Sequence, residues 1–222
     1  MILDDLDQGL IKSLSDGHFH SGVDLSEGLG VTRTTISNRL KQLEQLGLEV
    51  ASVRGRGYRL LAPIERLDEA LIRASFSEDA EQYCQGLSRF DVLDSTNTYL
   101  MNEAKQGLPS GHVCLAEHQT LGRGRMGRNW VSAYGNNIYL SLLWRFNEVR
   151  HVQGLSLAVG VVVARALQGV LGLERVRLKW PNDIWVDGRK LGGILIEMAG
   201  EVHGGAALVL GVGLNGRLPR AA

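Results

Sequence analysis

The chain has 222 residues, with 24 Lys or Arg and 24 Asp or Glu, so its formal net charge is zero. This length accommodates one large domain or two small ones. Zero net charge excludes recruitment of nucleic acid by a global field, so any such binding must come from a local basic surface. The two cysteines offer neither a disulfide framework nor paired metal-ligand spacing. They suit a reducing cytoplasm and predict no protein-bound metal. The start of the chain is acidic and lacks the basic residues of a signal peptide.

Residues 1–62 predict a winged helix-turn-helix. Apolar residues at helical spacing indicate a first helix around 6–14, and a second, short helix is expected over 21–29. Thr32 can cap a third helix after a tight Gly-Val turn. A hairpin with a glycine-rich tip follows over 50–61. Three helices and a hairpin in this order are typical of that DNA-binding motif.

The charge distribution in this unit favours DNA binding. Residues 1–32 hold six acidic side chains against one lysine, whereas residues 33–59 hold six basic side chains against two acidic ones. The third helix and the wing can therefore meet phosphate. The expected DNA-binding residues are Arg33, Thr34, Thr35, Ser37 and Asn38 in the helix and Arg54 and Arg56 in the wing. A protein-contact module of the same shape stays as an alternative.

The rest of the chain predicts a linker with a short helix over 63–88 and an α+β domain over 89–222. Strands are expected over 90–94, 113–117, 138–144, 176–180, 184–186, 193–198 and 206–211, and helices over 96–106 and 155–171. The last helix is strongly apolar but contains Arg165 and Gln168. We therefore expect a buried helix behind the sheet and not a membrane span.

The loop over 119–130 alternates three glycines with Arg123, Arg125 and Arg128 and contains no acidic residue. Glycine lets the backbone approach a ligand closely, and arginine is a forked donor for carboxylate and phosphate oxygens. The pattern predicts a loop that stays mobile until an anion neutralises it; a solvated basic loop is the alternative. A dinucleotide-binding motif is excluded because a strand and not a helix follows, and a P-loop because no Gly-Lys-Ser/Thr follows.

Five blocks in order make the chain resemble biotin protein ligases, most of all the bacterial proteins that also repress the biotin operon. The blocks are Asp94–Asn97, the Gly-Arg loop over 122–128, Lys179–Asp183, Lys190–Leu195 and Gly211–Asn215. The resemblance covers nearly the whole chain. It implies an α+β fold in which a winged helix-turn-helix precedes a mixed, largely antiparallel sheet domain like that of class II aminoacyl-tRNA synthetases.

The resemblance also implies an activity. A cytoplasmic member would use ATP, with Mg²⁺ on the nucleotide, to convert biotin to biotinyl-AMP. It would then transfer biotin to a lysine of a biotin carboxyl carrier protein. It would also repress biotin synthesis genes as a ligand-promoted homodimer on operator DNA, with no membrane partner.

Site residues follow from the matching blocks. The resemblance implies catalytic roles for Lys190, Arg125 and Asp183. Biotin contacts are expected from Ser95, Thr96, Asn97, Gln119, Arg123, Gly124, Arg125 and Lys190, and adenylate contacts from Arg125, Arg128, Trp130, Asn182, Lys190 and Asn215. Taken alone, these residues have simpler interpretations: Lys190 and Asp183 as turn residues, Ser95 to Asn97 as a helix cap and first turn, and Trp130 as core.

Two departures from the family pattern bear on function. Met126 stands where some relatives have a further arginine. The chain stops shortly after Asn215, whereas relatives continue with more helices and an SH3-like barrel, so we expect a fragment or a naturally short product. A biotin-responsive DNA-binding regulator with little or no ligase activity is therefore the alternative function. A lipoate-type ligase with a fused DNA-binding domain is a third, which the Gly-Arg loop argues against.

Overall fold

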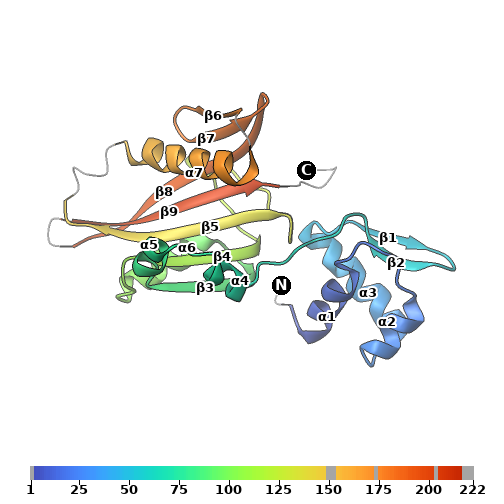
Figure 1. The fold of residues 1–222 in the computed structure, drawn as a ribbon. Coiled ribbons are helices and arrows are strands. Elements are labelled where there is room, and N and C mark those ends of the chain that lie inside the picture. Colours follow the sequence, from blue (N-terminus) through green and yellow to red (C-terminus); the bar gives the residue numbers. More distant parts are fainter. Residues whose placement is uncertain (1–2, 149–153, 173–174, 203–204, 217–222) are drawn as a thin grey trace.

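The computed structural model describes residues 3–148, 154–172, 175–202 and 205–216 (Figure 1). The N-terminal unit contains α1 (Asp5–Leu14), α2 (Gly22–Gly28), α3 (Arg33–Leu43), a 3₁₀ turn (Glu44–Leu46), β1 (Val50–Val53) and β2 (Gly57–Leu60). β1 and β2 form an antiparallel hairpin. The predicted winged helix-turn-helix is confirmed.

Local sequence explains where these helices begin. Asp4, Ser21 and Thr32 each accept a hydrogen bond from a backbone N–H in the first turn of the helix that follows. Such caps satisfy donors that have no partner inside the helix. The apolar stripes of α1 and α3 then meet in one core, in which Leu10 and Ile36 are fully buried.

The second unit is built on one seven-stranded sheet. Its strands are β3 (Gly86–Leu93), β4 (His112–Gln119), β5 (Asn137–Phe146), β6 (Val176–Lys179), β7 (Asp183–Val186), β8 (Arg189–Val202) and β9 (Gly205–Asn215), in the order β3-β4-β5-β9-β8-β7-β6. Only the β3–β4 pair is parallel among the described strands, so the predicted mixed, largely antiparallel sheet is confirmed. Two short helices, α4 (Glu69–Ala74) and α5 (Glu78–Tyr83), stand where one was predicted, and β3 begins earlier than the predicted strand.

The two longer helices of this unit pack on opposite faces of the sheet. α6 (Thr96–Lys105) buries Leu100 against Leu143 and Val209, whereas α7 (Leu155–Leu171) packs Leu167 near Ile194. Because side chains alternate along a strand, odd-numbered residues of β5, of β9 and of the Gly193–Glu197 part of β8 face α6, and even-numbered ones face α7.

α7 differs from the prediction of a buried helix. Only one stripe of it covers the sheet, and the outer side chains Leu157, Val161 and Val162 are exposed, Val162 by 67%. Within the described part of the chain, no helix has the length and apolar character needed to cross a membrane.

Tyr134 connects the two units. It lies between β4 and β5, yet its side chain is fully buried in the apolar cluster of the N-terminal unit. Its N–H donates to the Leu46 carbonyl at 3.0 Å, and its hydroxyl donates to Asp91 at 3.1 Å. Asp91 also pairs with Arg66 and Arg89. The segment that follows the Gly-Arg loop is thus anchored in the core of the winged helix.

Candidate active site

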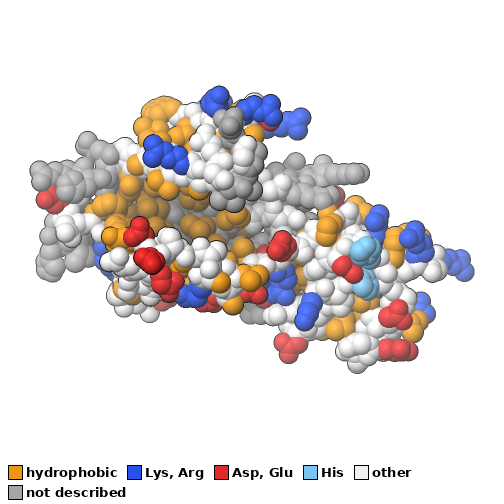
Figure 2. Space-filling model, viewed as in Figure 1, with side chains coloured by type: hydrophobic (Ala, Val, Ile, Leu, Met, Phe, Trp, Pro, Cys, Tyr) orange, Lys and Arg blue, Asp and Glu red, His pale blue; other side chains and the backbone are white. Residues whose placement is uncertain are grey.

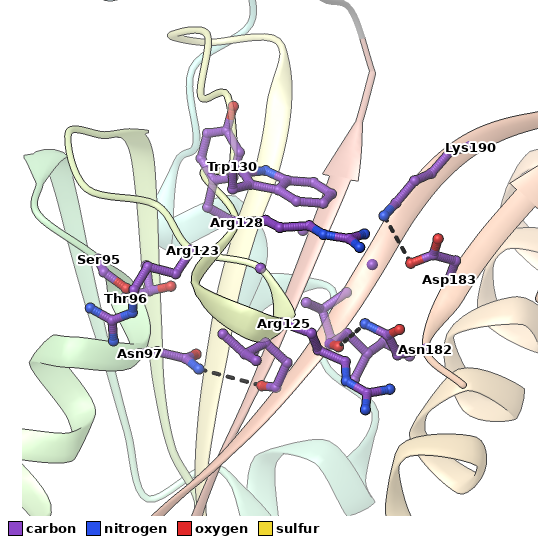
Figure 3. Close-up of a pocket in the computed structure, with 18 of the residues that line it drawn as sticks. Ser95, Thr96, Asn97, Arg123, Arg125, Arg128, Trp130, Asn182, Asp183 and Lys190 are labelled. Atoms are coloured by element: carbon purple, nitrogen blue, oxygen red, sulfur yellow. Dashed lines mark hydrogen bonds and ion pairs between the residues drawn. The ribbon is translucent and has the colours of Figure 1, made fainter. Parts of the chain in front are cut away.

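A cavity of about 400 Å³ opens on the α6 face of the sheet (Figure 3). This size suits a small organic ligand. α6 and β4 supply a polar wall, the loop over 120–130 supplies cations, and β8 and β9 supply glycine backbone. The turn from β6 to β7, with a cis Trp180–Pro181 peptide, closes the opposite side. All five blocks singled out in the sequence therefore contribute several lining residues to one cavity.

Ser95 caps α6, and together with Thr96, the first residue of the helix, it forms part of the polar wall. Ser95 accepts from the Thr98 N–H, while the Thr96 N–H and hydroxyl donate to Gln119 Oε1 at 2.8 and 3.1 Å. Since Oε1 is occupied, the orientation of the Gln119 carboxamide is set. Its Nε2 has no hydrogen-bond acceptor among the described residues and remains a donor for a ligand. The predicted helix cap is confirmed, and the same segment lines the cavity, while its contact with biotin stays a prediction.

Asn97 lines the cavity, but its side-chain amide already has hydrogen-bond partners within the protein. Its Nδ2 donates to Glu197 at 2.7 Å and to the Leu195 carbonyl at 3.3 Å, and its Oδ1 accepts from Ser141 at 2.6 Å. The residue is only 4% exposed. Its polar groups are therefore engaged within the protein, although the residue lines the cavity beside Ser95 and Thr96, so its contact with biotin stays a prediction.

The Gly-Arg loop is partly compensated. Arg123 lies 3.4 Å from Glu197, an acid that the sequence analysis did not assign. Arg125 and Arg128 are exposed and make no ion pair with any described residue. Two backbone hydrogen bonds close the loop, from the Gly124 N–H to Arg128 and from the Trp130 N–H to Gly122. The prediction of uncompensated charge thus applies to two of the three arginines.

Lys190 and Asp183 form an ion pair of 2.8 Å at the pocket (Figure 3). The Lys190 ammonium also lies 5.5 Å from the centre of the Trp130 ring. Asn182 is tied to β8, because its Nδ2 donates to the Ile194 carbonyl and its own carbonyl accepts from the Ile194 N–H. Its Oδ1 has no described partner and can accept a hydrogen bond from a ligand.

Trp130 forms part of the pocket wall and rests on two glycines. A Cβ on Gly213 would lie 2.8 Å from the indole ring, and one on Gly193 would lie 3.3 Å from it. The indole can therefore occupy this position only because Gly213 has no side chain. Its Nε1 is buried and lacks a partner among the described residues.

Asn215, expected at the nucleotide, does not line the cavity. β9 runs on to this residue and pairs it with Asn137 of β5. The antiparallel pairing carries the end of the strand past the pocket, so only Gly211 to Gly213 reach it.

The N-terminal unit presents basic side chains at its wing (Figure 2). Arg33, Thr34 and Asn38 are exposed on α3, and Arg54 is exposed at the hairpin tip. Thr35 and Ser37 are half-buried, because they lie closer to the apolar stripe of α3. The Arg56 guanidinium stacks 4.1 Å above the Phe19 ring, an arrangement that holds it at the surface of the wing.

Arg39 does not belong to this basic surface, although it contributed to the charge count of residues 33–59. It pairs with Asp4 at 2.7 Å and with buried Asp7 at 3.1 Å. Burial is the largest influence on Asp7 and raises its pKa. Arg39 therefore joins α3 to α1 and does not contribute to the basic surface.

Comparison with known proteins agrees with this arrangement. Residues 89–215, more than half of the chain, match the Biotin/lipoate A/B protein ligase family. The chain belongs to this family. Residues 10–59 match an HTH domain, so this member of the ligase family carries a helix-turn-helix ahead of its ligase fold.

Two relatives of this ligase family member share both parts. The bifunctional ligase/repressor BirA of Salmonella typhimurium is 42% identical over 207 residues, which cover 93% of this chain and 62% of that protein. BirA of Bacillus subtilis is 36% identical over 204 residues, covering 91% and 62%. The chain therefore spans less than two thirds of the length of these relatives.

Solved structures show the same ligase fold. The biotin protein ligase from Aquifex aeolicus in complex with biotin and ATP has a TM-score of 0.51 and 30% identity, covering 62% of this chain and 56% of that one. The ligase from Leishmania major in complex with biotinyl-5-AMP has a TM-score of 0.51 and 28% identity, covering 59% and 57%.

Proposed function

We propose that the chain is a biotin protein ligase whose winged helix also makes it a biotin-controlled repressor. The observation that carries the ligase function is that one cavity combines an oriented amide donor, Gln119 Nε2, with the cations of the Gly-Arg loop and Lys190. The donor and the neighbouring hydroxyls suit the neutral ureido ring of biotin, and the cations suit its carboxylate and a phosphate. The BirA names of the relatives support the same proposal.

The proposed reaction has two steps. A carboxylate oxygen of biotin first bonds to the α-phosphorus of ATP while the bond to pyrophosphate breaks, giving biotinyl-AMP. The neutral amine of a lysine on a biotin carboxyl carrier protein then attacks the acyl carbon. AMP leaves, the nitrogen loses a proton and an amide forms.

The first step brings two anions together and therefore needs fixed positive charge. Lys190, Arg125 and Arg128 line the cavity and can supply it. Trp130 and the Asn182 Oδ1 offer a flat face and an acceptor for the adenine ring. Mg²⁺ is proposed to enter on the ATP phosphates, since the described His, Cys, Asp and Glu side chains form no group of three that could hold a metal.

Asp183 is proposed to receive the proton of the acceptor lysine. In the ligand-free chain its carboxylate is bound to Lys190. When Lys190 turns to phosphate oxygens, the Asp183 carboxylate is released toward the mouth of the cavity. The same exchange of partners would prepare the site for both steps.

Calorimetric titration with biotin, with and without ATP, followed by mass detection of biotinyl-AMP tests the ligase function. Lys190→Ala should slow adenylate formation about 100- to 1,000-fold, because a preorganised cation at the developing charge contributes on the order of 3 kcal/mol, and should weaken biotin binding less. Adenylate formation at the parental rate in Lys190→Ala would mean that Lys190 is only a turn residue. Biotin binding without any adenylate would favour the regulator that lacks ligase activity.

The repressor function rests on the exposed helix and wing residues. One winged helix makes few contacts with DNA, so we propose that two copies bind a palindromic operator and that biotinyl-AMP promotes their pairing. Arg56→Ala should weaken binding to all DNA and reduce the salt dependence by about one unit of slope. Lys12→Ala on α1 serves as the control with an equal loss of charge. A mobility-shift assay with a biotin-operon promoter fragment measures how much of the DNA is bound. Unchanged occupancy of the fragment on addition of biotin and ATP would contradict the proposal.

A further inference from the structure

Glu197 lies behind the cavity and belongs to none of the sequence blocks. It shares the α6 face of β8 with Gly193 and Leu195, because alternate residues of a strand face the same side. Its side chain is 27% exposed and does not itself line the cavity. The residue is an acid in the middle of a stretch of apolar strand, a position at which a charge needs partners.

One carboxylate oxygen of Glu197 determines how Asn97 is oriented. Oε2 accepts from Asn97 Nδ2 at 2.7 Å, and the same nitrogen donates to the Leu195 carbonyl at 3.3 Å. Both partners can only accept, so the amide nitrogen must face them and the amide oxygen must face the other way. That oxygen lies 2.6 Å from Ser141 Oγ.

The chain of contacts continues from Ser141 to the ligand-facing donor. Ser141 Oγ lies 2.7 Å from Thr96 Oγ1, and Thr96 holds Gln119 Oε1. Ser141 is fully buried and Thr96 is 4% exposed, so water does not compete for these contacts. Gly211 provides the room, since a Cβ there would lie 2.9 Å from the carboxamide carbon of Asn97. The orientation set at Glu197 is thereby passed on to the polar wall of the cavity.

The other carboxylate oxygen of Glu197 contacts the Gly-Arg loop. Oε1 lies 3.4 Å from an Arg123 nitrogen. This is the ion pair that ties a loop cation to the sheet, while Arg125 and Arg128 have no such partner among the described residues. An anionic ligand that binds Arg123 must compete with this carboxylate.

We propose that Glu197 is a positioning residue with one task for each oxygen. Through Asn97 it holds the polar wall in register, and through Arg123 it holds the Gly-Arg loop against the sheet until the anionic end of the ligand replaces it. The identity of that ligand as biotin rests on the proposed function; the two contacts themselves do not.

Two substitutions separate the tasks. Glu197→Gln retains an acceptor oxygen for Asn97 but loses the charge that holds Arg123, whereas Glu197→Ala loses both. In the ligand-free chain, tryptic cleavage in the loop over 123–128 should increase several-fold in both variants. The melting temperature should fall by roughly 2–8 °C only in Glu197→Ala, because the Asn97 amide is then buried without its strongest acceptor. Glu78→Gln, an exposed carboxylate on α5, should change neither measurement.

Titration with biotin and with its uncharged carboxamide analogue completes the test. In both variants Arg123 is released from Glu197, so the affinity for biotin relative to that for the analogue should rise by roughly two- to tenfold. Only Glu197→Ala should weaken the binding of both ligands. Parental cleavage, melting temperature and affinity ratio in both variants would overturn the role of Glu197. If the parent chain binds no biotin while the ligand-free results appear as expected, the ligase proposal fails and the positioning role stands.

Discussion

The close packing of the Trp130 indole on Gly213 allows a quantitative prediction for Gly213→Ala. A methyl group at this position would lie 2.8 Å from two indole carbons, whereas a methyl group at Gly193 would lie 3.3 Å from one. The first contact cannot exist without displacement of the ring, and the second requires a shift of only a few tenths of an ångström. Overpacking of this kind costs about 1–3 kcal/mol.

The cost should appear in nucleotide binding if the indole moves out of the pocket wall. Loss of about 1–3 kcal/mol corresponds to a roughly 5- to 150-fold weaker affinity for ATP in the presence of biotin. Calorimetry of the parent chain, Gly213→Ala and the matched control Gly193→Ala measures it, with melting temperatures to confirm that all three are folded. Equal ATP affinities in the two variants would refute the argument that the position of the indole depends on the missing side chain at Gly213.

Three further predictions concern stability and its pH dependence. Tyr134→Ala should lower the free energy of unfolding by about 3–5 kcal/mol, because the ring fills the core shared by both units. Tyr134→Phe should lower it by only about 1 kcal/mol, because this variant loses only the hydrogen bond to Asp91. Equal urea midpoints for the two variants would contradict this prediction. Burial lowers the pKa of His118, so the unfolded chain binds more protons and stability should decrease as the pH falls below about 6.5. Between pH 7.5 and 5.5 the melting temperature of His118→Gln should therefore fall by less than that of the parent chain. An equal fall in both would contradict the predicted contribution of His118. Arg39→Met should destabilise the chain at neutral pH because it breaks the ion pairs with Asp4 and Asp7. The destabilisation should become smaller at low pH, where these two carboxylates are protonated. DNA affinity in a mobility-shift assay should not change.

Much of the fold is predictable because its signals are local. Thr32 and Ser95 begin their helices through bonds to backbone groups three residues away. Apolar periodicity then distinguishes helices from strands without reference to the rest of the molecule. The errors lie where local signals are weak, as at the early start of β3 and the exposed outer face of α7, whose apolar sequence does not reveal how much of it the sheet covers.

The candidate site could be predicted in part for a different reason. Lys190 and Arg125 stand in short blocks whose order along the chain resembles that of biotin protein ligases, and the resemblance implied their joint use, although neither residue is distinctive alone. Asn215 belongs to such a block as well, yet the pairing of β9 with β5 takes it away from the cavity. Membership of a block therefore predicts proximity to the site and not a place in the cavity wall.

The sequence by itself determined the order of the elements, the helix caps and the residue types available for binding, because these depend on neighbours along the chain. Only the tertiary structure decided which of those residues meet. Asn97 and Glu197 are 100 positions apart, and Arg123 and Glu197 are 74 apart. Their contacts depend on the strand register that places β8 beside β9 and on the absent side chain at Gly211. An acid within an apolar strand was the one local sign of this network, because burial of its charge requires partners that the sequence does not name.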